Sequence, residues 1–302
     1  MYSLILAQVG KLFFFLLVGY VLRRCDIMPD NTPTVLSKLT LWVLRPALSF
    51  QTFVRNFTLE TLKTSYILLL AGIGMLLVLE LISHPLAKLL TKDLYMRNIC
   101  SYSMTIPNYG YIGYVLILAL FGEETLLKFQ IFCLPIGFYI YGYYYPKLLG
   151  IEKVSVRSMI NAPMIALVAG AVGGLAGLRL PAIVSETLTS AANCMGPVTM
   201  ILTGCTIAHF AFKDILCDWR TYAVVLIRMI VYPLFVFAVC RLTKLPRELT
   251  VLMVAYNVMP TGLNTVVFPS SVGKDCRLGA GMACVSNVFC IVSIPLLLAL
   301  VM

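Results

Sequence analysis

The sequence predicts an all-α polytopic membrane protein with ten transmembrane helices, and two observations carry this prediction. First, 60% of the 302 residues are hydrophobic and 12% are charged, whereas soluble domains are nearer 45–50% apolar and about 25% charged. Second, the apolar residues form long continuous runs, unlike the alternating segments of a membrane β-barrel. Because a helical span needs about 20 apolar residues, the composition allows roughly nine or ten spans. It argues against an ordinary soluble enzyme.

Charged or turn-rich breaks separate the apolar runs. The first run has no small-residue cleavage site after it, so we expect a retained helix and not a signal peptide. The later breaks are too short to hold a soluble domain. In chain order the expected spans are 4–22, 34–54, 64–83, 98–120, 127–146, 159–178, 187–210, 221–240, 248–270 and 278–300.

The formal net charge of +10 lies mostly in the short loops between these runs. We therefore interpret the basic residues as determinants of topology against the lipid bilayer, and expect no binding of nucleic acid. With the N-terminus outside, inside loops hold more Lys and Arg than outside loops, although residues 241–247 carry three against this trend. We expect a multi-pass protein of the plasma membrane with both termini outside.

Prolines and glycines recur along the chain at an offset of 151–153 residues. The pairs are Pro29 and Pro181, Pro46 and Pro197, Pro107 and Pro260, Gly110 and Gly262, and Gly122 and Gly273. Since each pair falls in corresponding spans, we expect residues 1–150 and 151–302 to be two five-span repeats. An odd number of spans inverts the second repeat, and inverted repeats are typical of secondary transporters.

Two expected spans carry helix-breaking residues near their middle. They are Pro107, Asn108 and Gly110 in span 98–120, and Pro260, Thr261, Gly262 and Asn264 in span 248–270. Proline removes a backbone donor and glycine weakens the helix, so both segments should unwind. A kink would explain either one alone, but two at matching repeat positions indicate a transport site. The freed N–H groups suit a carboxylate, with Asn108 and Asn264 adding side-chain amides.

Six stretches of the chain form a recognisable set: 19–24 (GYVLRR), 45–50 (RPALSF), 106–122 beginning IPN, 161–163 (NAP) with the glycines after it, 228–233 (RMIVYP) and 259–262 (MPTG). Together they resemble the auxin efflux carrier family, which includes the plant PIN carriers and bacterial malate and malonate permeases. The resemblance covers nearly the whole chain. The Pro-Asn of span 4, combined with the proline of span 9, is its specific part.

This resemblance implies a scaffold of spans 1, 2, 6 and 7 and a transport bundle of spans 3–5 and 8–10. It implies that spans 4 and 9 cross at Pro107 and Pro260, and that Asn108 contacts a substrate carboxylate beside the crossing. Where the plant pattern has glutamine after the second proline, this chain has Thr261. We consider Asn264 as a substitute for that contact.

Two further residues are candidates for the site. Arg45 stands inside span 34–54, and its guanidinium would pair with an anionic substrate; the alternative is that it snorkels to headgroups. Tyr139 is the deepest of several tyrosines at 139–145. We interpret these tyrosines as an aromatic belt, with Tyr139 as a candidate to line a cavity.

Arg228 and Glu80 are the other ionisable residues inside spans that we interpret. For Arg228 we favour a structural role, in which it pairs with a helix end or with carbonyls. Glu80 would either couple transport to protons or, as we prefer, lie at the interface and pair with Lys88 or His84. Neither Asp nor Glu stands at the expected crossing, so the sequence leaves coupling to H⁺, to Na⁺ or to neither ion open.

The leading interpretation is a secondary carrier of a small organic anion, a malate-like or auxin-like mono- or dicarboxylate, working by alternating access. The alternative is a membrane ligand sensor or a passive channel on the same scaffold. No phosphate-binding loop, H-E-x-x-H motif or C-x-x-C pair occurs, so we expect no enzyme activity, no cofactor and no metal site. The small-residue spacing of Gly170, Gly173, Gly174 and Gly177 marks a close helix contact, for which we consider a homodimer through the scaffold helices.

Overall fold

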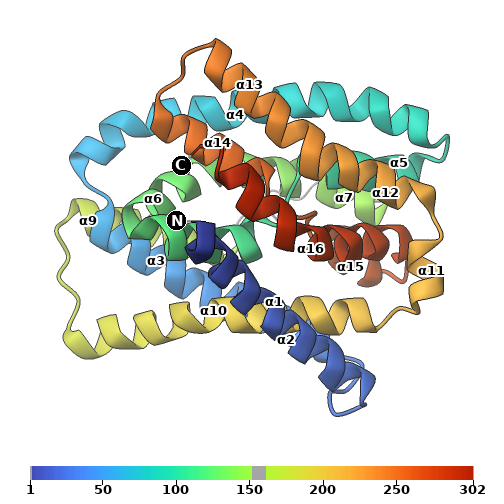
Figure 1. The fold of residues 1–302 in the computed structure, drawn as a ribbon. Coiled ribbons are helices and arrows are strands. Elements are labelled where there is room, and N and C mark those ends of the chain that lie inside the picture. Colours follow the sequence, from blue (N-terminus) through green and yellow to red (C-terminus); the bar gives the residue numbers. More distant parts are fainter. Residues whose placement is uncertain (1, 152–160, 302) are drawn as a thin grey trace.

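The computed structural model describes residues 2–151 and 161–301, and every regular element in these ranges is helical (Figure 1). The predicted all-α class is confirmed. Five of the described helices are long and apolar enough to cross a membrane: Ile5–Arg24, Leu59–Leu90, Ala182–Ala208, Trp219–Leu242 and Arg277–Leu298. The start of the expected span 159–178 lies outside the described residues.

Helices α1 and α10 pack along each other through glycines. α1 (Tyr2–Arg24) runs beside α10 (Ala182–Ala208). A Cβ atom added at Gly204 would collide with the Leu16 carbonyl, and one added at Gly19 would collide with the backbone of Ile201. Glycine at both positions therefore lets the two backbones approach closely, as is common between membrane helices.

The glycine stripe that we considered for a dimer packs within the chain. α9 (Ala162–Leu175) lies along α3 (Arg45–Asn56). A Cβ at Gly170 would come within 2.7 Å of the Phe50 carbonyl, and one at Gly174 within 2.6 Å of the Phe57 carbonyl. The predicted close helix contact is confirmed, but its partner is α3 of the same chain, so the stripe gives no support to a homodimer.

Three helices widen into a π-helical turn directly before a proline. In η1 (Thr40–Leu44), η3 (Ile140–Tyr144) and η4 (Ile227–Val231), the residue after the turn donates its N–H five residues back. A proline follows one position later in each case. Because the proline ring clashes with the carbonyl four residues earlier, the wider turn lets the helix continue. The elements so joined are α2 (Thr32–Leu39) to α3, α6 (Tyr114–Tyr139) to α7 (Tyr145–Leu149), and α12 (Trp219–Leu226) to α13 (Tyr232–Leu242).

The two predicted helix breaks are confirmed. α5 (Leu94–Thr105) ends before Pro107, and the chain resumes as η2 (Tyr109–Gly113) and α6. α14 (Arg247–Asn257) ends before Pro260, and α15 (Asn264–Ser270) follows. Within α6, Gly122 has a φ of +83° and divides the helix. The remaining elements are α4 (Leu59–Leu90), α11 (Phe212–Leu216) and α16 (Arg277–Leu298).

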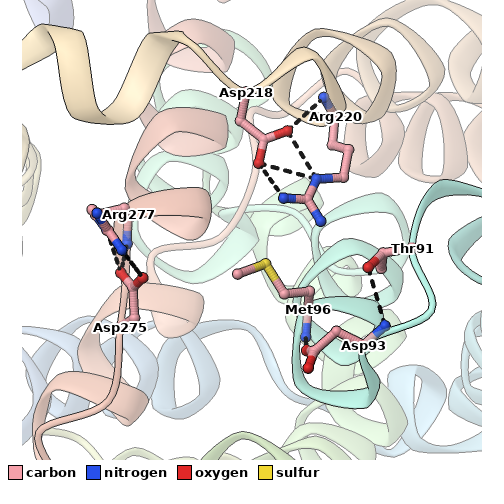
Figure 2. A network of polar contacts seen from close by, with 7 residues as sticks. All are labelled: Thr91, Asp93, Met96, Asp218, Arg220, Asp275 and Arg277. Atoms are coloured by element: carbon pink, nitrogen blue, oxygen red, sulfur yellow. Dashed lines mark hydrogen bonds and ion pairs between the residues drawn. The ribbon is translucent and has the colours of Figure 1, made fainter.

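Aspartates stand at the starts of α5, α12 and α16, and Figure 2 shows these three starts near one another. The Asp93 carboxylate accepts the Met96 N–H at 2.7 Å. Asp218 likewise accepts the backbone N–H of the arginine two positions on, at 3.0 Å, and Asp275 does so at 2.9 Å. Each therefore satisfies a backbone donor that the first helical turn leaves free. A hydrogen bond from the arginine side chain holds the pKa of Asp218 and of Asp275 below the usual value.

Candidate functional site

The two helix breaks pair with each other through their backbones. The Asn108 N–H donates to the Pro260 carbonyl at 2.8 Å, and the Gly262 N–H donates to the Ile106 carbonyl at 3.3 Å, as in an isolated antiparallel bridge. Ile106 and Asn108 are buried, as are the residues opposite them. Non-helical backbone inside a membrane protein needs such partners, because lipid offers none.

Arg228 fixes the helix ends that lead into these breaks. Its guanidinium is fully buried and donates to the carbonyls of Met104 at 3.2 Å and Tyr256 at 2.8 Å, and to the Asn257 side-chain oxygen at 3.2 Å. Met104 and Tyr256 lie in the last turns of α5 and α14, where carbonyls lack helical partners and a cation is favourable. The structural role predicted for Arg228 is confirmed.

A cavity of about 80 Å³ lies beside the paired breaks. It is bounded by α3, by the start of α9, by residues on both sides of the first break, by the second half of α6, and by the start of α15. Its polar lining includes Arg45, Ser49, Tyr102, Asn108, Gln130 and Asn264. Pro107 and Gly262 contribute to the wall. Of the predicted site residues, the structure therefore brings Arg45, Pro107, Asn108 and Asn264 together.

Two buried amides that line this cavity have side-chain atoms without a hydrogen-bond partner among the described residues. Asn108 is 3% exposed and its side-chain nitrogen is unpaired; Gln130 is 1% exposed and both its side-chain oxygen and nitrogen are unpaired. Buried polar side chains are normally hydrogen-bonded, so these groups point to a ligand. Sequence reasoning missed Gln130. The available signal was a single amide inside the apolar run 127–146.

Arg45 supplies the positive charge of the cavity. It lies midway along the continuous helical stretch from Thr32 to Asn56, and its guanidinium carbon is 5.4 Å from the Tyr114 ring centroid and 5.9 Å from that of Tyr109. Aromatic faces attract such a cation. In the described ranges no carboxylate forms an ion pair with Arg45. The side chain faces the cavity, and this differs from the headgroup-facing alternative.

Two predicted residues take part in the pairing of the breaks and do not line the cavity. Pro260 provides the carbonyl for Asn108. Thr261 is fully buried, its N–H donates to the Ser286 hydroxyl at 3.1 Å, and the two hydroxyl oxygens are 3.0 Å apart. Thr261 therefore anchors the second break to α16.

Two other predicted site residues, Asn264 and Tyr139, already contact other side chains of the protein. The Asn264 amide nitrogen donates to the Tyr102 hydroxyl at 2.8 Å, within the cavity wall. Tyr139 stacks on Tyr143, with ring centroids 4.7 Å apart, and is absent from the cavity lining. The structure does not bring Tyr139 to the other candidates.

Glu80 pairs differently from our expectation. Its carboxylate accepts the Tyr144 hydroxyl at 2.8 and 2.9 Å and the Thr105 hydroxyl at 3.0 Å. No ion pair with Lys88 or His84 occurs among the described residues. The expected pairing of Glu80 with Lys88 or His84 was therefore wrong, because hydroxyls from α5 and η3 reach the carboxylate.

Comparisons with known proteins agree with a transport role. The sequence profile of the membrane transport protein family matches residues 4–151 and 146–298. One similar protein, an uncharacterized transporter of Methanocaldococcus jannaschii, is 25% identical over 297 residues, which cover 93% of each chain. Within residues 2–151 and 161–301, no group of three or more His, Cys, Asp or Glu side chains is placed to hold a metal ion.

Proposed function

The chain belongs to the membrane transport protein family, and on this premise we propose that it is a secondary carrier of a small organic anion. The resemblance to the auxin efflux carrier family is confirmed by this match. A membrane transporter is generally not an enzyme. The substrate and the mechanism are proposals from the site.

One observation carries the proposal. The guanidinium of the half-buried Arg45 and the amides of Asn108 and Gln130, which have nitrogens without a partner in the described part of the chain, line one cavity beside two paired helix breaks. Arginine and amide N–H groups are donors to carboxylate oxygens. Broken helices at matching depths are the usual setting of transporter sites. A mono- or dicarboxylate is the ligand that these donors favour.

We further propose ten spans in two inverted repeats, residues 1–150 and 151–302. Backbone conformation supports the repeat. Asp26 and Gly177 both have positive φ, at +54° and +66°, and so do Gly122 and Gly273, at +83° and +71°. Each pair is 151 residues apart, so corresponding turns of the two halves leave the helical conformation in the same way.

The capped helix starts support the proposed topology. Expected spans 4, 8 and 10 are even-numbered, so in a ten-span chain all three begin on one side of the membrane. Their starts at Asp93, Asp218 and Asp275 lie near one another (Figure 2), and the Tyr95 hydroxyl donates to the Asp275 carbonyl at 2.8 Å. With both termini outside the plasma membrane, this side faces the cytoplasm.

In the proposed mechanism the substrate carboxylate binds where spans 4 and 9 cross. The bundle of spans 3–5 and 8–10 carries it past the scaffold of spans 1, 2, 6 and 7, so that the cavity opens to one side at a time. The backbone pairing between the breaks supports a bundle that moves as one body, because it links both halves of the chain at the site.

Ligand binding and uptake by the purified protein test the proposal. Malate, malonate, succinate, lactate and indole-3-acetate are screened by thermal shift, since a ligand of the native state raises Tm with concentration. Labelled hits are then followed into proteoliposomes. Asn108→Ala should abolish the shift and the uptake while the protein still melts cooperatively. Asn193→Ala, at an exposed position of α10 outside the cavity, should leave both unchanged.

The outcomes separate the functions. Binding with saturable uptake supports the carrier. Binding without flux would identify a ligand sensor, and uptake that does not saturate would identify a channel. A cooperatively melting protein that responds to none of the acids contradicts the carboxylate proposal.

A further inference from the structure

A second recess, at the far end of the molecule from the capped helix starts, has a basic lining that the proposed function does not use. It is open, has a volume of about 700 Å³, and lies between the end of α13, the start of α14 and the residues that follow α16. Figure 1 shows the connection from α13 to α14 near the C-terminus. The basic residues of the lining are Arg241, Lys244 and Arg247, and its apolar residues are Phe237, Cys240, Leu245, Leu300 and Val301. The recess therefore combines three cations with an apolar wall.

The charge of this recess is not balanced by a carboxylate among its lining residues. Neither Arg241 nor Lys244 forms an ion pair within the part of the chain that the structure describes. The acidic residue nearest in sequence, Glu248, pairs with Lys128 and does not line the recess. The recess is therefore suited to an anion.

The backbone at Lys244 has a conformation that favours glycine. The turn that ends α13 is a Schellman motif, in which the Leu245 N–H donates to the Cys240 carbonyl at 3.0 Å and the Lys244 N–H to the Arg241 carbonyl at 3.3 Å. Lys244 has a φ of +54°, whereas the same position of the turn after α9 holds Gly177, with a φ of +66°. Glycine adopts this conformation at lower cost. A lysine in the less favourable place points to a use of its side chain.

The recess lies where a membrane-spanning helix reaches the headgroups. The continuous stretch Trp219–Leu242 has 24 residues, which at 1.5 Å per residue is about 36 Å long. The hydrocarbon core is about 30 Å thick, so with one end at Asp218 the other end reaches the opposite headgroup region. In the proposed topology this is the outer side, where basic loop residues are not favoured by the topology rule. The three basic residues therefore need another explanation.

We infer that this recess binds the headgroup of an anionic phospholipid, whose phosphate is held by Arg241, Lys244 and Arg247 while its acyl chains follow the apolar wall at Phe237. The charge requires an anion, the apolar wall suits attached hydrocarbon, and the depth matches a component of the bilayer. A free phosphate would satisfy the charge alone and would fill only a small part of the 700 Å³. The inference goes beyond the carrier function, since the two sites share no lining residue.

A lipid titration of the purified protein tests the site without any transport measurement. Phosphatidylglycerol and phosphatidylcholine with identical acyl chains are added in a non-ionic detergent, and Tm is followed against concentration, because a ligand of the native state raises it. A basic residue near a charged lipid contributes roughly fivefold in affinity. Phosphatidylglycerol should therefore act at a concentration at least about fivefold lower than phosphatidylcholine.

Two results of this titration would overturn the inference. Equal responses to the two lipids would mean that the headgroup charge is not recognised. Inorganic phosphate and glycerol 3-phosphate, added at the same concentrations, should leave Tm unchanged. If they reproduce the shift, the occupant is a soluble phosphate and not a lipid.

Variants assign the effect to the recess. Lys244→Gly removes the side chain and suits the turn better, so Tm without added lipid should stay the same or rise, while the affinity for phosphatidylglycerol should fall about fivefold. Arg247→Gln should weaken this affinity in the same way. Lys63→Gln removes one positive charge at an exposed position of α4 outside the recess and should keep it. Full affinity in both recess variants would contradict the inference and would leave the carrier proposal as it stands.

Discussion

Arg228 is a single residue that holds two helix ends. Its guanidinium donates to the last-turn carbonyls of α5 and α14 and is fully buried. Arg228→Met would leave both carbonyls without a partner, and an unsatisfied buried group costs about 1–3 kcal/mol. We therefore expect a loss of about 2–5 kcal/mol of stability, measured as a large fall of Tm in detergent. Arg241→Met, at an exposed position of α13, should melt close to the unaltered protein. An Arg228→Met protein with an unchanged Tm would contradict the role assigned here.

A substitution at Gly110 would displace the positive charge of Arg45 without removing it. A Cβ at this residue would lie 3.0–3.1 Å from the guanidinium of Arg45, and the atoms it meets are the free end of a flexible side chain. Gly110→Ala should therefore displace the guanidinium and weaken anion binding several-fold, while Tm stays the same or rises because alanine favours helix. Gly10→Ala, which has open space around it, is the matched control. Unaltered affinity in Gly110→Ala would separate Arg45 from the ligand.

At the scale of the element, the capped helix starts respond to pH. The hydrogen bond from Arg220 holds the pKa of Asp218 below its ordinary value of 3.8. A group with a lowered folded-state pKa stabilises the protein above its unfolded pKa and loses this effect as pH falls through the folded value. Asp218→Ala removes the cap and should cost roughly 1 kcal/mol of stability. At pH 7 this loss should lower Tm by up to about 4 °C. The difference from the unaltered protein should shrink below about pH 4. Glu186→Ala, at an exposed position of α10, removes a carboxylate without removing a helix cap and is the matched control.

The helix breaks could be predicted from the sequence because their cause is local. Proline removes a helical hydrogen bond and glycine weakens the helix through the residues of the chain itself, so the combination of both with polar residues at Pro107 and at Pro260 marked the two breaks correctly. Gln130 was missed because an amide in an apolar run gains meaning only when a cavity forms beside it. The partners of Glu80 were wrong for a related reason. We expected Glu80 to pair with residues one or two turns away on its own helix, whereas its partner Tyr144 is 64 residues away along the chain.

At the scale of the whole molecule, glycine-mediated contacts join the helices of the proposed scaffold to one another. α1 packs on α10, and α3 packs on α9, through glycines that bring backbones together. These four helices belong to the proposed scaffold. α6, which carries Gln130, belongs to the proposed moving bundle. Gly196 of α10 meets α6, since its Cβ would lie 2.9 Å from a methyl of Val115. Transport by a moving bundle requires this contact to change.

A disulfide across that contact tests the movement. Val115→Cys with Gly196→Cys would join bundle to scaffold, and Gly173→Cys with Val54→Cys would join two scaffold helices, where the corresponding distance is 2.7 Å. Both distances end at a valine Cγ, which is one bond from the valine Cβ, so the two Cβ atoms of each pair lie within about 4.5 Å, as a disulfide needs. The exposed Cys25, Cys194 and Cys217 are first replaced by serine. Oxidation should stop uptake in the first variant, with recovery on reduction, because a covalent link prevents the cavity from changing sides. In the second variant uptake should persist. Full uptake by the oxidised first variant would mean that α6 and α10 do not move apart, and the proposed division into scaffold and bundle would have to be abandoned.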